Sequence, residues 1–305
     1  MTITVYGDEA LEAVTEAASE INRLDALLSA EDEESEIYAI NETGSGTLSE
    51  DTAYLVQRAL EIAQMTDGSF NIAVYPLMVL WGFPSQEYTV PDAEEIEALL
   101  PVTDLENVVL WDDGETLSLE NGAEIDLGGI VKGYLSDRME AVFDTYDVTG
   151  AVCSLGGNIY VYGLKTDGSD WNIGIQDPEG DTGTDVIAAV QVHDISVITS
   201  GGYERYFEED GVTYHHILDP DTGYPADSGL LSATIISEDG TLADALSTAL
   251  FVMGEDDAAA LWRQDPDAFD FILVKEDGSI TVSEGISERF SVTDARTDVT
   301  VVTAE

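Results

Sequence analysis

The sequence contains few positive charges. Ten lysine and arginine residues stand against 63 aspartate and glutamate residues in a chain of 305, which gives a formal net charge of -53. A surface with this charge repels nucleic acid and anionic lipid, so neither is expected as a partner. The acidic residues are scattered along the chain, which is typical of a solvating surface suited to high salt or a secreted setting. A docking surface for a basic partner is the alternative.

Cysteine and long apolar runs are also scarce. The single cysteine, Cys153, excludes a disulfide framework, and its apolar neighbours in residues 151–155 favour a buried core residue over a nucleophile. No stretch approaches the roughly 18 apolar residues of a membrane span. No signal peptide is recognisable either, because MTITVYG at the start alternates like a strand. A trimmed native N-terminus is one interpretation of this start.

The apolar residues that are present predict a globular α+β fold. They make up 44% of the chain, enough for a full core. Residues 8–29 show helical spacing, and a second helix is expected after Asp51, placed as its N-cap. From residue 107 onward, short strands alternate with Gly and Asp turns, and helices are expected near 129–145, 241–253 and 255–264. We therefore predict a single domain over residues 1–305, with mostly antiparallel sheets and packed helices.

The segment TLADALSTALFVM at residues 241–253 reads as a buried helix. Asp244 and Thr248 lie four residues apart on one face of it. A buried carboxylate without a cation is costly, and this helix carries no lysine or arginine. The pair is either a set of oxygen ligands for a hard cation such as Mg²⁺, or a first-turn carboxylate with a threonine that bonds back to a carbonyl.

The segment AEIDLGGIVKGYLSD at residues 123–137 suits an anion. Asp126 ends an apolar strand, Gly128 and Gly129 permit a close backbone approach, and a helix follows. Lys132, one of three lysines in the chain, stands where a helix N-terminus would bind phosphate. A tight turn with an exposed lysine explains the same residues.

Two of the three histidines are adjacent in TYHHILDPDTGYP, at residues 213–225. In a strand, His215 and His216 would face opposite ways, so that one could serve as a general base. A plain hairpin turn is the alternative, since DPDTG is a turn signal.

Taken together, these segments resemble the ApbE family, the FAD:protein FMN transferases. The resemblance runs from about residue 20 to the C-terminus. It is carried by seven segments in sequence order, namely DGSFNIAVYPLMVLWGF, IDLGGIVKGYLSD, LGGNIYVYG, WNIGIQDP, TSGGYERYFEEDGVTYHHILDPDTGYP, LADALSTALFVMG and ILVKEDGSITVSEGI.

The resemblance implies an ApbE-like, T-fold-like flavin transferase fold and a reaction. FMN would pass from FAD to a threonine hydroxyl of an acceptor flavoprotein that bears a Ser/Thr-Gly-Ala-Thr-like motif, and AMP would leave. Mg²⁺ would be bound by Asp244, Thr248 and the backbone carbonyl of Gly129. His216 would be the base. The residues implied in FAD binding are Ser69, Phe70, Asn71, Asp126, Lys132 and Leu231.

Three positions depart from the family pattern. Asn71 stands where the family usually has aspartate, and Glu31 stands where members often have an aromatic residue that packs on the nucleotide. The N-terminal Met-Gly-Thr motif is absent or shortened at Met1. The same site would also serve an FAD pyrophosphatase that releases FMN and AMP, and the departures leave room for a flavin-binding protein without chemistry. Family members are often lipoproteins outside the cytoplasmic membrane, so the resemblance implies an extracytoplasmic or cell-envelope location. No lipobox is present, and a cytoplasmic location stays open.

Overall fold

The computed structural model describes residues 1–180 and 184–305, whose contacts divide the chain into two compact units. Unit 1 comprises residues 1–20, 132–203 and 227–305, and unit 2 comprises residues 21–131 and 204–226. The single domain expected over residues 1–305 stays a prediction. Within the described ranges, no helix has both the length and the apolar character needed to cross a membrane.

Unit 1 is built on an eight-stranded sheet of order β1-β5-β6-β9-β12-β13-β14-β16. A three-stranded sheet of order β15-β8-β7 belongs to the same unit. In the described chain every pairing in these two sheets is antiparallel except that of β14 with β16. The strands are β1 (Thr2–Gly7), β5 (Val148–Ser154), β6 (Ile159–Gly163), β7 (Trp171–Gln176), β8 (Val186–Val192), β9 (Ile195–Gly201), β12 (Leu230–Ser237), β13 (Asp270–Lys275), β14 (Ile280–Ser283), β15 (Phe290–Val292) and β16 (Val299–Val302).

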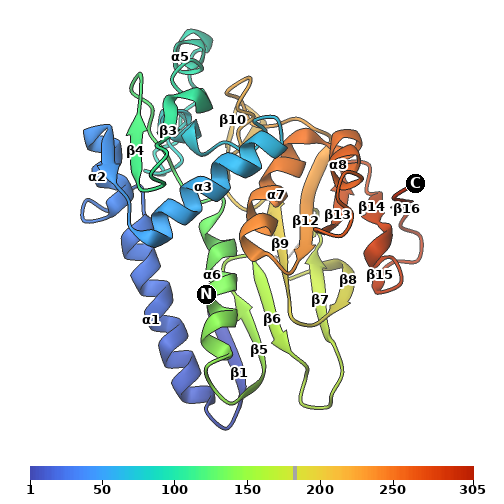
Figure 1. The fold of residues 1–305 in the computed structure, drawn as a ribbon. Helices are drawn as coiled ribbons and strands as arrows, with labels where there is room; N and C mark the ends of the chain where they lie inside the picture. The colour runs from blue at the N-terminus through green and yellow to red at the C-terminus, as the bar shows by residue number, and fades with distance from the viewer. Residues whose placement is uncertain (181–183) are drawn as a thin grey trace. The chain divides into compact units, whose positions relative to one another are not determined.

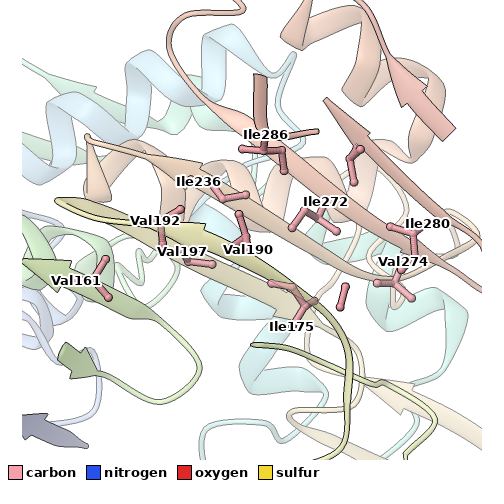
Figure 2. Packing of buried hydrophobic residues seen from close by; sticks show 12 residues of the cluster. Val161, Ile175, Val190, Val192, Val197, Ile236, Ile272, Val274, Ile280 and Ile286 are labelled. Carbon is pink, nitrogen blue, oxygen red and sulfur yellow. The ribbon is translucent and has the colours of Figure 1, made fainter. Parts of the chain in front are cut away.

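Alternation along these strands produces a buried core of β-branched residues. Successive side chains of a strand point to opposite faces of its sheet. Val197 of β9 and Ile236 of β12 are register partners and both join this core. Figure 2 shows the cluster, which also draws on β6, β7, β8, β13 and β14. The β-branched side chains suit the pleated surface, so the same residues form the strands and fill the core.

Helices complete unit 1. Helix α7 (Gly240–Met253) packs against β9 and β12, as Figure 1 shows, and α8 (Glu255–Trp262) follows it. Helix α6 (Val131–Phe143) leads into β5. The N-terminal half of α1 (Ala10–Leu28) belongs to this unit and the remainder of α1 to unit 2. Nearly all of α7 is buried, as its apolar sequence predicts.

Unit 2 combines short helices with a three-stranded sheet of order β2-β4-β3 and the hairpin β10-β11. Trp81 and Phe83 are fully buried in its core, and the Trp81 indole donates to the carbonyl of Gly223 at 2.9 Å. Its remaining elements are α2 (Glu36–Thr43), β2 (Ser45–Thr47), α3 (Glu50–Met65), η1 (Ile72–Val74), α4 (Tyr75–Leu80), α5 (Ala93–Leu99), η2 (Leu105–Asn107), β3 (Val108–Leu110), β4 (Thr116–Leu119), β10 (Tyr206–Glu209) and β11 (Val212–His215).

The α+β class with mostly antiparallel sheets is confirmed, but two local predictions need correction. The N-cap of α3 is Ser49, and Asp51 lies in the first helical turn, where its charge still favours the helix N-terminus. The strand expected to contain both His215 and His216 ends at His215. Helix α2 has no counterpart among the expected elements, because only Ile37 and Ile40 of its eight residues are buried.

Candidate functional site

Asp244 is a buried carboxylate held by two neutral donors. It lies on the second turn of α7 with 3% of its surface exposed. The backbone N–H of Gly133 donates to its Oδ2 and the side-chain amide of Asn158 donates to its Oδ1, both at 2.9 Å. In the part of the chain that the structure describes, no lysine or arginine forms a salt bridge with it. The two donors therefore orient the carboxylate without neutralising its negative charge, so that it is suited to bind a cation.

Asp244 does not cap the helix. The N-cap of α7 is Asp239, whose side chain accepts from the N–H of Leu242 at 2.8 Å. Asp137 of α6 accepts from the N–H groups of Gly240 and Thr241 at 2.7 and 2.9 Å. Since these two carboxylates satisfy the helix N-terminus, the interpretation of Asp244 as a first-turn carboxylate stabilised there is wrong.

Two glycines permit the close approach of α6 to α7. A Cβ atom on Gly133 would lie 2.6 Å from the Cβ of Asp244, and one on Gly240 would lie 2.6 Å from the carbonyl oxygen of Gly133. Both distances are too short for side chains at these positions. The absence of Cβ atoms thus allows the Gly133 N–H to reach the Asp244 carboxylate.

Thr248 lies one turn after Asp244 and is partly buried. Its hydroxyl is 3.2 Å from the hydroxyl of Ser200 on β9, which also bonds Ser247 at 2.7 Å. The back-bond to a helix carbonyl is made by Ser247, which donates to the carbonyl of Asp244 at 2.7 Å. The Thr248 hydroxyl is thus held by the sheet, on the helix face that it shares with Asp244.

Lys132 and Gly129 flank the start of α6. Lys132 lies in the first turn of α6 and is partly buried. Within residues 1–180 and 184–305, its side chain forms neither a salt bridge nor a hydrogen bond. Gly129 belongs to unit 2, in the turn where the N–H of Ile130 donates to Leu127 at 3.0 Å. A cation at a helix N-terminus suits an anion, although the Gly133 amide of the same turn is already bonded to Asp244.

Asp126 of unit 2 has a carboxylate that is costly to ionise. Burial raises its pKa, and nearby Glu31 raises it further, while a bond from the Gly128 N–H at 3.0 Å and the Arg205 guanidinium lower it. Burial raises the pKa of Tyr75 to about 12, and Glu31 again adds to the effect. Glu31, which stands where family members often carry an aromatic residue, therefore adds negative charge to the surroundings of Asp126 and Tyr75.

The 69–71 stretch is held within unit 2. Asn71 is the N-cap of η1, and its side chain accepts from Ala73 at 2.7 Å while donating to the carbonyl of Thr103 at 2.9 Å. Phe70 is buried with 3% of its surface exposed, and Ser69 is partly exposed. Both ends of the Asn71 amide are used within the protein, so this side chain supports the loop.

Leu231 lies on β12 in unit 1. The register of β12 against β13 shifts between Leu230 and Ser232, so Leu231 stands at an irregularity of the ladder. Its side chain is partly buried and packs against the β-branched core. Any ligand that it contacts would meet an apolar surface.

His216 follows the end of β11 directly. Its ring Nδ1 lies 3.2 Å from the carbonyl oxygen of Arg205, and its backbone N–H donates to the same oxygen at 3.0 Å. A carbonyl only accepts, so Nδ1 carries the hydrogen, and in the neutral ring of this tautomer Nε2 is the nitrogen with a lone pair. The ring of His215 bonds a different carbonyl, that of Ala226, through its Nε2 at 3.1 Å. The two rings thus bond different carbonyls, but the strand ends between them. The opposite facing expected for two adjacent strand residues stays a prediction.

The donor set suits a hard cation. Among the described residues, no group of three or more His, Cys, Asp or Glu side chains is placed to hold a metal ion. A metal site here would rely on the Asp244 carboxylate, the Thr248 hydroxyl and backbone oxygen. Oxygen ligands of this kind, with several positions left to water and phosphate, fit Mg²⁺ better than zinc.

Comparison with known proteins identifies the family. The ApbE family profile matches residues 1–273. This chain belongs to the ApbE family. It is 36% identical over 301 residues to the FAD:protein FMN transferase of Treponema pallidum (strain Nichols), covering 93% of this chain and 83% of that protein. It is 37% identical over 288 residues to the FAD:protein FMN transferase of Klebsiella pneumoniae (strain 342), covering 93% and 89%.

Solved structures agree with the ApbE assignment. The crystal structure of the ApbE protein from Thermotoga maritima superposes with a TM-score of 0.85 at 39% identity, covering 93% of this chain and 92% of that one. The flavin transferase ApbE from Vibrio cholerae superposes with a TM-score of 0.82 at 27% identity, covering 94% of each chain. The family and fold implied by the sequence resemblance are both confirmed.

Asn158 and Gly133 are the residues of this ApbE chain whose roles the sequence did not reveal. Asn158 follows the turn of Gly156 and Gly157, and two glycines before an apolar run indicate no more than a turn that leads into a strand. Its amide meets a carboxylate 86 positions away, and the Gly133 N–H meets the same carboxylate 111 positions away. The sequence marks Asn158 in one way only, since a polar amide stands directly before the apolar strand β6, where a hydrophobic residue would be expected.

Proposed function

We propose that this ApbE-family chain is a Mg²⁺-dependent transferase that moves FMN from FAD to a threonine hydroxyl of an acceptor flavoprotein and releases AMP. The observation that carries the proposal is Asp244, a buried carboxylate that is oriented by Gly133 and Asn158 and has no protein cation among the described residues. The relatives named as FAD:protein FMN transferases support it.

The metal ligands in this proposal are Asp244, Thr248 and the backbone carbonyl of Gly129. Mg²⁺ bound there would stabilise the negative charge that builds up on the transferring phosphate. The chain supplies the charge and the orientation, because Asp244 is locked by two donors and the Thr248 hydroxyl is held by Ser200.

The remaining residues would bind FAD. Lys132 is a cation at a helix N-terminus that forms no salt bridge within the described chain, which suits a phosphate of the pyrophosphate group. The family resemblance adds Ser69, Phe70, Asn71, Asp126 and Leu231 as FAD contacts. For Asn71 we expect an indirect contribution, since its amide already bonds Ala73 and Thr103.

His216 would take the proton of the acceptor. The threonine oxygen forms a bond to the FMN-side phosphorus, the bond from that phosphorus to the bridging oxygen breaks, and AMP leaves with the bridging oxygen. The hydroxyl proton passes to Nε2 of His216, the acceptor in the tautomer that the Arg205 carbonyl favours.

The test is an intact-mass measurement on an acceptor protein that bears a Ser/Thr-Gly-Ala-Thr-like motif. After incubation with this chain, FAD and Mg²⁺, we expect one covalently attached FMN per acceptor and an equal amount of AMP. The matched control is the same acceptor with the threonine changed to alanine, which should stay unmodified. AMP released without an acceptor would instead indicate the pyrophosphatase. Tight FAD binding without AMP would indicate a binding protein and contradict the proposal.

A further inference from the structure

Asn158 occupies a buried position that an apolar residue would be expected to fill. It is fully buried, and it connects the turn of Gly156 and Gly157, with φ angles of 71° and 96°, to β6. Its side-chain Nδ2 donates to Oδ1 of Asp244 at 2.9 Å. Its own Oδ1 has no hydrogen-bond partner among the described residues. Buried polar atoms are almost always paired, so an unpaired amide oxygen in this position needs an explanation.

Stability alone does not explain this amide. A buried carbonyl oxygen without a partner lowers the free energy of unfolding, and an apolar side chain of similar volume would avoid that loss. The neighbouring Tyr160 and Ser196, register partners on β6 and β9, likewise carry buried hydroxyls without a hydrogen-bond partner in the described chain, so neither hydroxyl bonds Asp244. What distinguishes Asn158 is its bond to the carboxylate.

The bond fixes the direction of that carboxylate. With Gly133 on Oδ2 and Asn158 on Oδ1, both oxygens of Asp244 are held, and rotation about the bond to the carboxyl carbon is restricted. Because both donors are neutral, the full negative charge remains for a cation, whereas a lysine or arginine in place of Asn158 would neutralise it. Each carboxylate oxygen keeps a second lone pair for a ligand.

We propose that Asn158 is a positioning residue for the metal site, an inference that rests on the proposed function. It holds the Asp244 carboxylate in the orientation that binds Mg²⁺, and its Oδ1 accepts a hydrogen bond from a water in the site. Carboxylates that bind metals are themselves oriented by hydrogen bonds, and loss of such a partner typically costs about 10- to 100-fold in metal affinity. Mg²⁺ retains several waters, which supplies a donor for the unpaired oxygen.

The experiment titrates FAD by flavin fluorescence in Mg²⁺ and in EDTA. We compare wild type, Asn158→Leu, Asn158→Ser, Asp244→Asn and the control Ser196→Ala. The control removes another fully buried, unpaired polar atom, which lies on the neighbouring strand and forms no hydrogen bond with Asp244. We expect Asn158→Leu to need about 10- to 100-fold more Mg²⁺ to reach the tight FAD complex, with its FAD affinity in EDTA unchanged. Ser196→Ala should behave like wild type.

A second measurement separates positioning from folding. In the transfer assay, Asn158→Leu should raise the Mg²⁺ concentration for half-maximal rate while the rate at saturating Mg²⁺ stays near that of wild type. A structural role alone would lower the active fraction and leave the Mg²⁺ dependence unchanged. The double variant Asn158→Leu with Asp244→Asn should show no loss beyond Asp244→Asn, because Asn158 acts through that carboxylate.

Each outcome decides one of the two ideas. If FAD binding to wild type does not depend on Mg²⁺, the proposed function fails. If FAD binding depends on Mg²⁺ in wild type and not in Asp244→Asn, the metal assignment stands. If FAD binding to Asn158→Leu then depends on Mg²⁺ as it does in wild type, the positioning role is overturned. If Asn158→Leu does not fold, Asn158→Ser decides. Its shorter side chain cannot span the same distance, so an unchanged Mg²⁺ dependence would equally overturn the inference.

Discussion

The carbonyl oxygen of Arg205 accepts two hydrogen bonds from His216, one from the backbone N–H and one from the ring Nδ1. The Arg205 guanidinium in turn donates to the carbonyl of Phe83 at 2.6 Å. The ring of His216 also lies 6.4 Å from that of Phe83, centroid to centroid, in an edge-on arrangement. The carbonyl of Arg205, directly before β10, thus holds the histidine in one tautomer. The ring also packs against Phe83 in the aromatic core of unit 2.

This arrangement predicts separable roles for the two adjacent histidines. His216→Ala should retain FAD binding and lose transfer by about 100- to 10,000-fold, the usual contribution of a general base. His215→Ala is the matched control, because its ring bonds the carbonyl of Ala226 and should affect transfer only mildly. The measurement is the transfer rate at saturating FAD. An inactive His215→Ala beside an active His216→Ala would show that the base is misassigned.

Asp244→Asn should remove the Mg²⁺ dependence of FAD binding. The substitution keeps the shape of the side chain but removes the charge that two neutral donors leave uncompensated. Flavin fluorescence titrations in Mg²⁺ and in EDTA should differ for wild type and coincide for the variant, which should also lose transfer. Since helix capping belongs to Asp239, Asp239→Asn should preserve the Mg²⁺ dependence, as Asn caps about as well as Asp. Equal Mg²⁺ dependence in wild type and Asp244→Asn would contradict the metal assignment.

Asp137 should make stability depend on pH. Burial raises its pKa from 3.8 to about 6, despite the lowering effect of the bonds from Thr241 and Gly240. A carboxyl with a higher pKa in the folded state binds its proton more tightly there, so the free energy of unfolding falls as pH rises from about 4 to about 6. At about 1.4 kcal/mol per pKa unit, the difference between wild type and Asp137→Asn should shift by up to about 3 kcal/mol over this range.

Chemical denaturation of both proteins at pH 4, 5, 6 and 7 measures this shift. The many other carboxyl groups titrate alike in the two proteins and cancel in the difference. Asp294→Asn is the control, because Arg296 lowers the pKa of Asp294 to about 2, so the advantage of wild type should rise slightly between pH 4 and 5 and then stay constant, opposite in sign to the effect of Asp137. A wild-type advantage over Asp137→Asn that grows with rising pH would contradict the prediction.

The net charge of -53 predicts that salt stabilises the fold. Salt screens the repulsion between carboxylates, and the Debye length falls from about 10 Å at 0.1 M to about 3 Å at 1 M. The Tm at pH 7 should therefore rise with NaCl over this range. Near pH 4, where many carboxyl groups are protonated, the same increase should be smaller. A Tm that falls steadily with NaCl at pH 7 would show that self-repulsion is not what limits the stability.

The local sequence pattern predicts much of the secondary structure of this protein, because the spacing of apolar and turn residues favours a helix or a strand before any distant contact forms. The apolar run of 241–253 predicts a buried helix, and the short β-branched runs between Gly and Asp turns predict strands of mostly antiparallel sheets, as the structure has them. The order of seven segments was enough for the family. The errors are also local in kind, since Ser49 and Asp51 are both good helix starters and only the observed backbone decides between them.

The sequence by itself determined that Asp244 and Thr248 share one face of a helix and that the helix has no cation of its own. Tertiary structure alone decided what surrounds them. Asn158 and Gly133 reach Asp244 across 86 and 111 positions, and Ser200 reaches Thr248 across 48. Such contacts depend on which strands pair and how closely two helices approach, and no periodicity of the chain encodes either. The carboxylate could therefore be found from the sequence, but the groups that orient it could not.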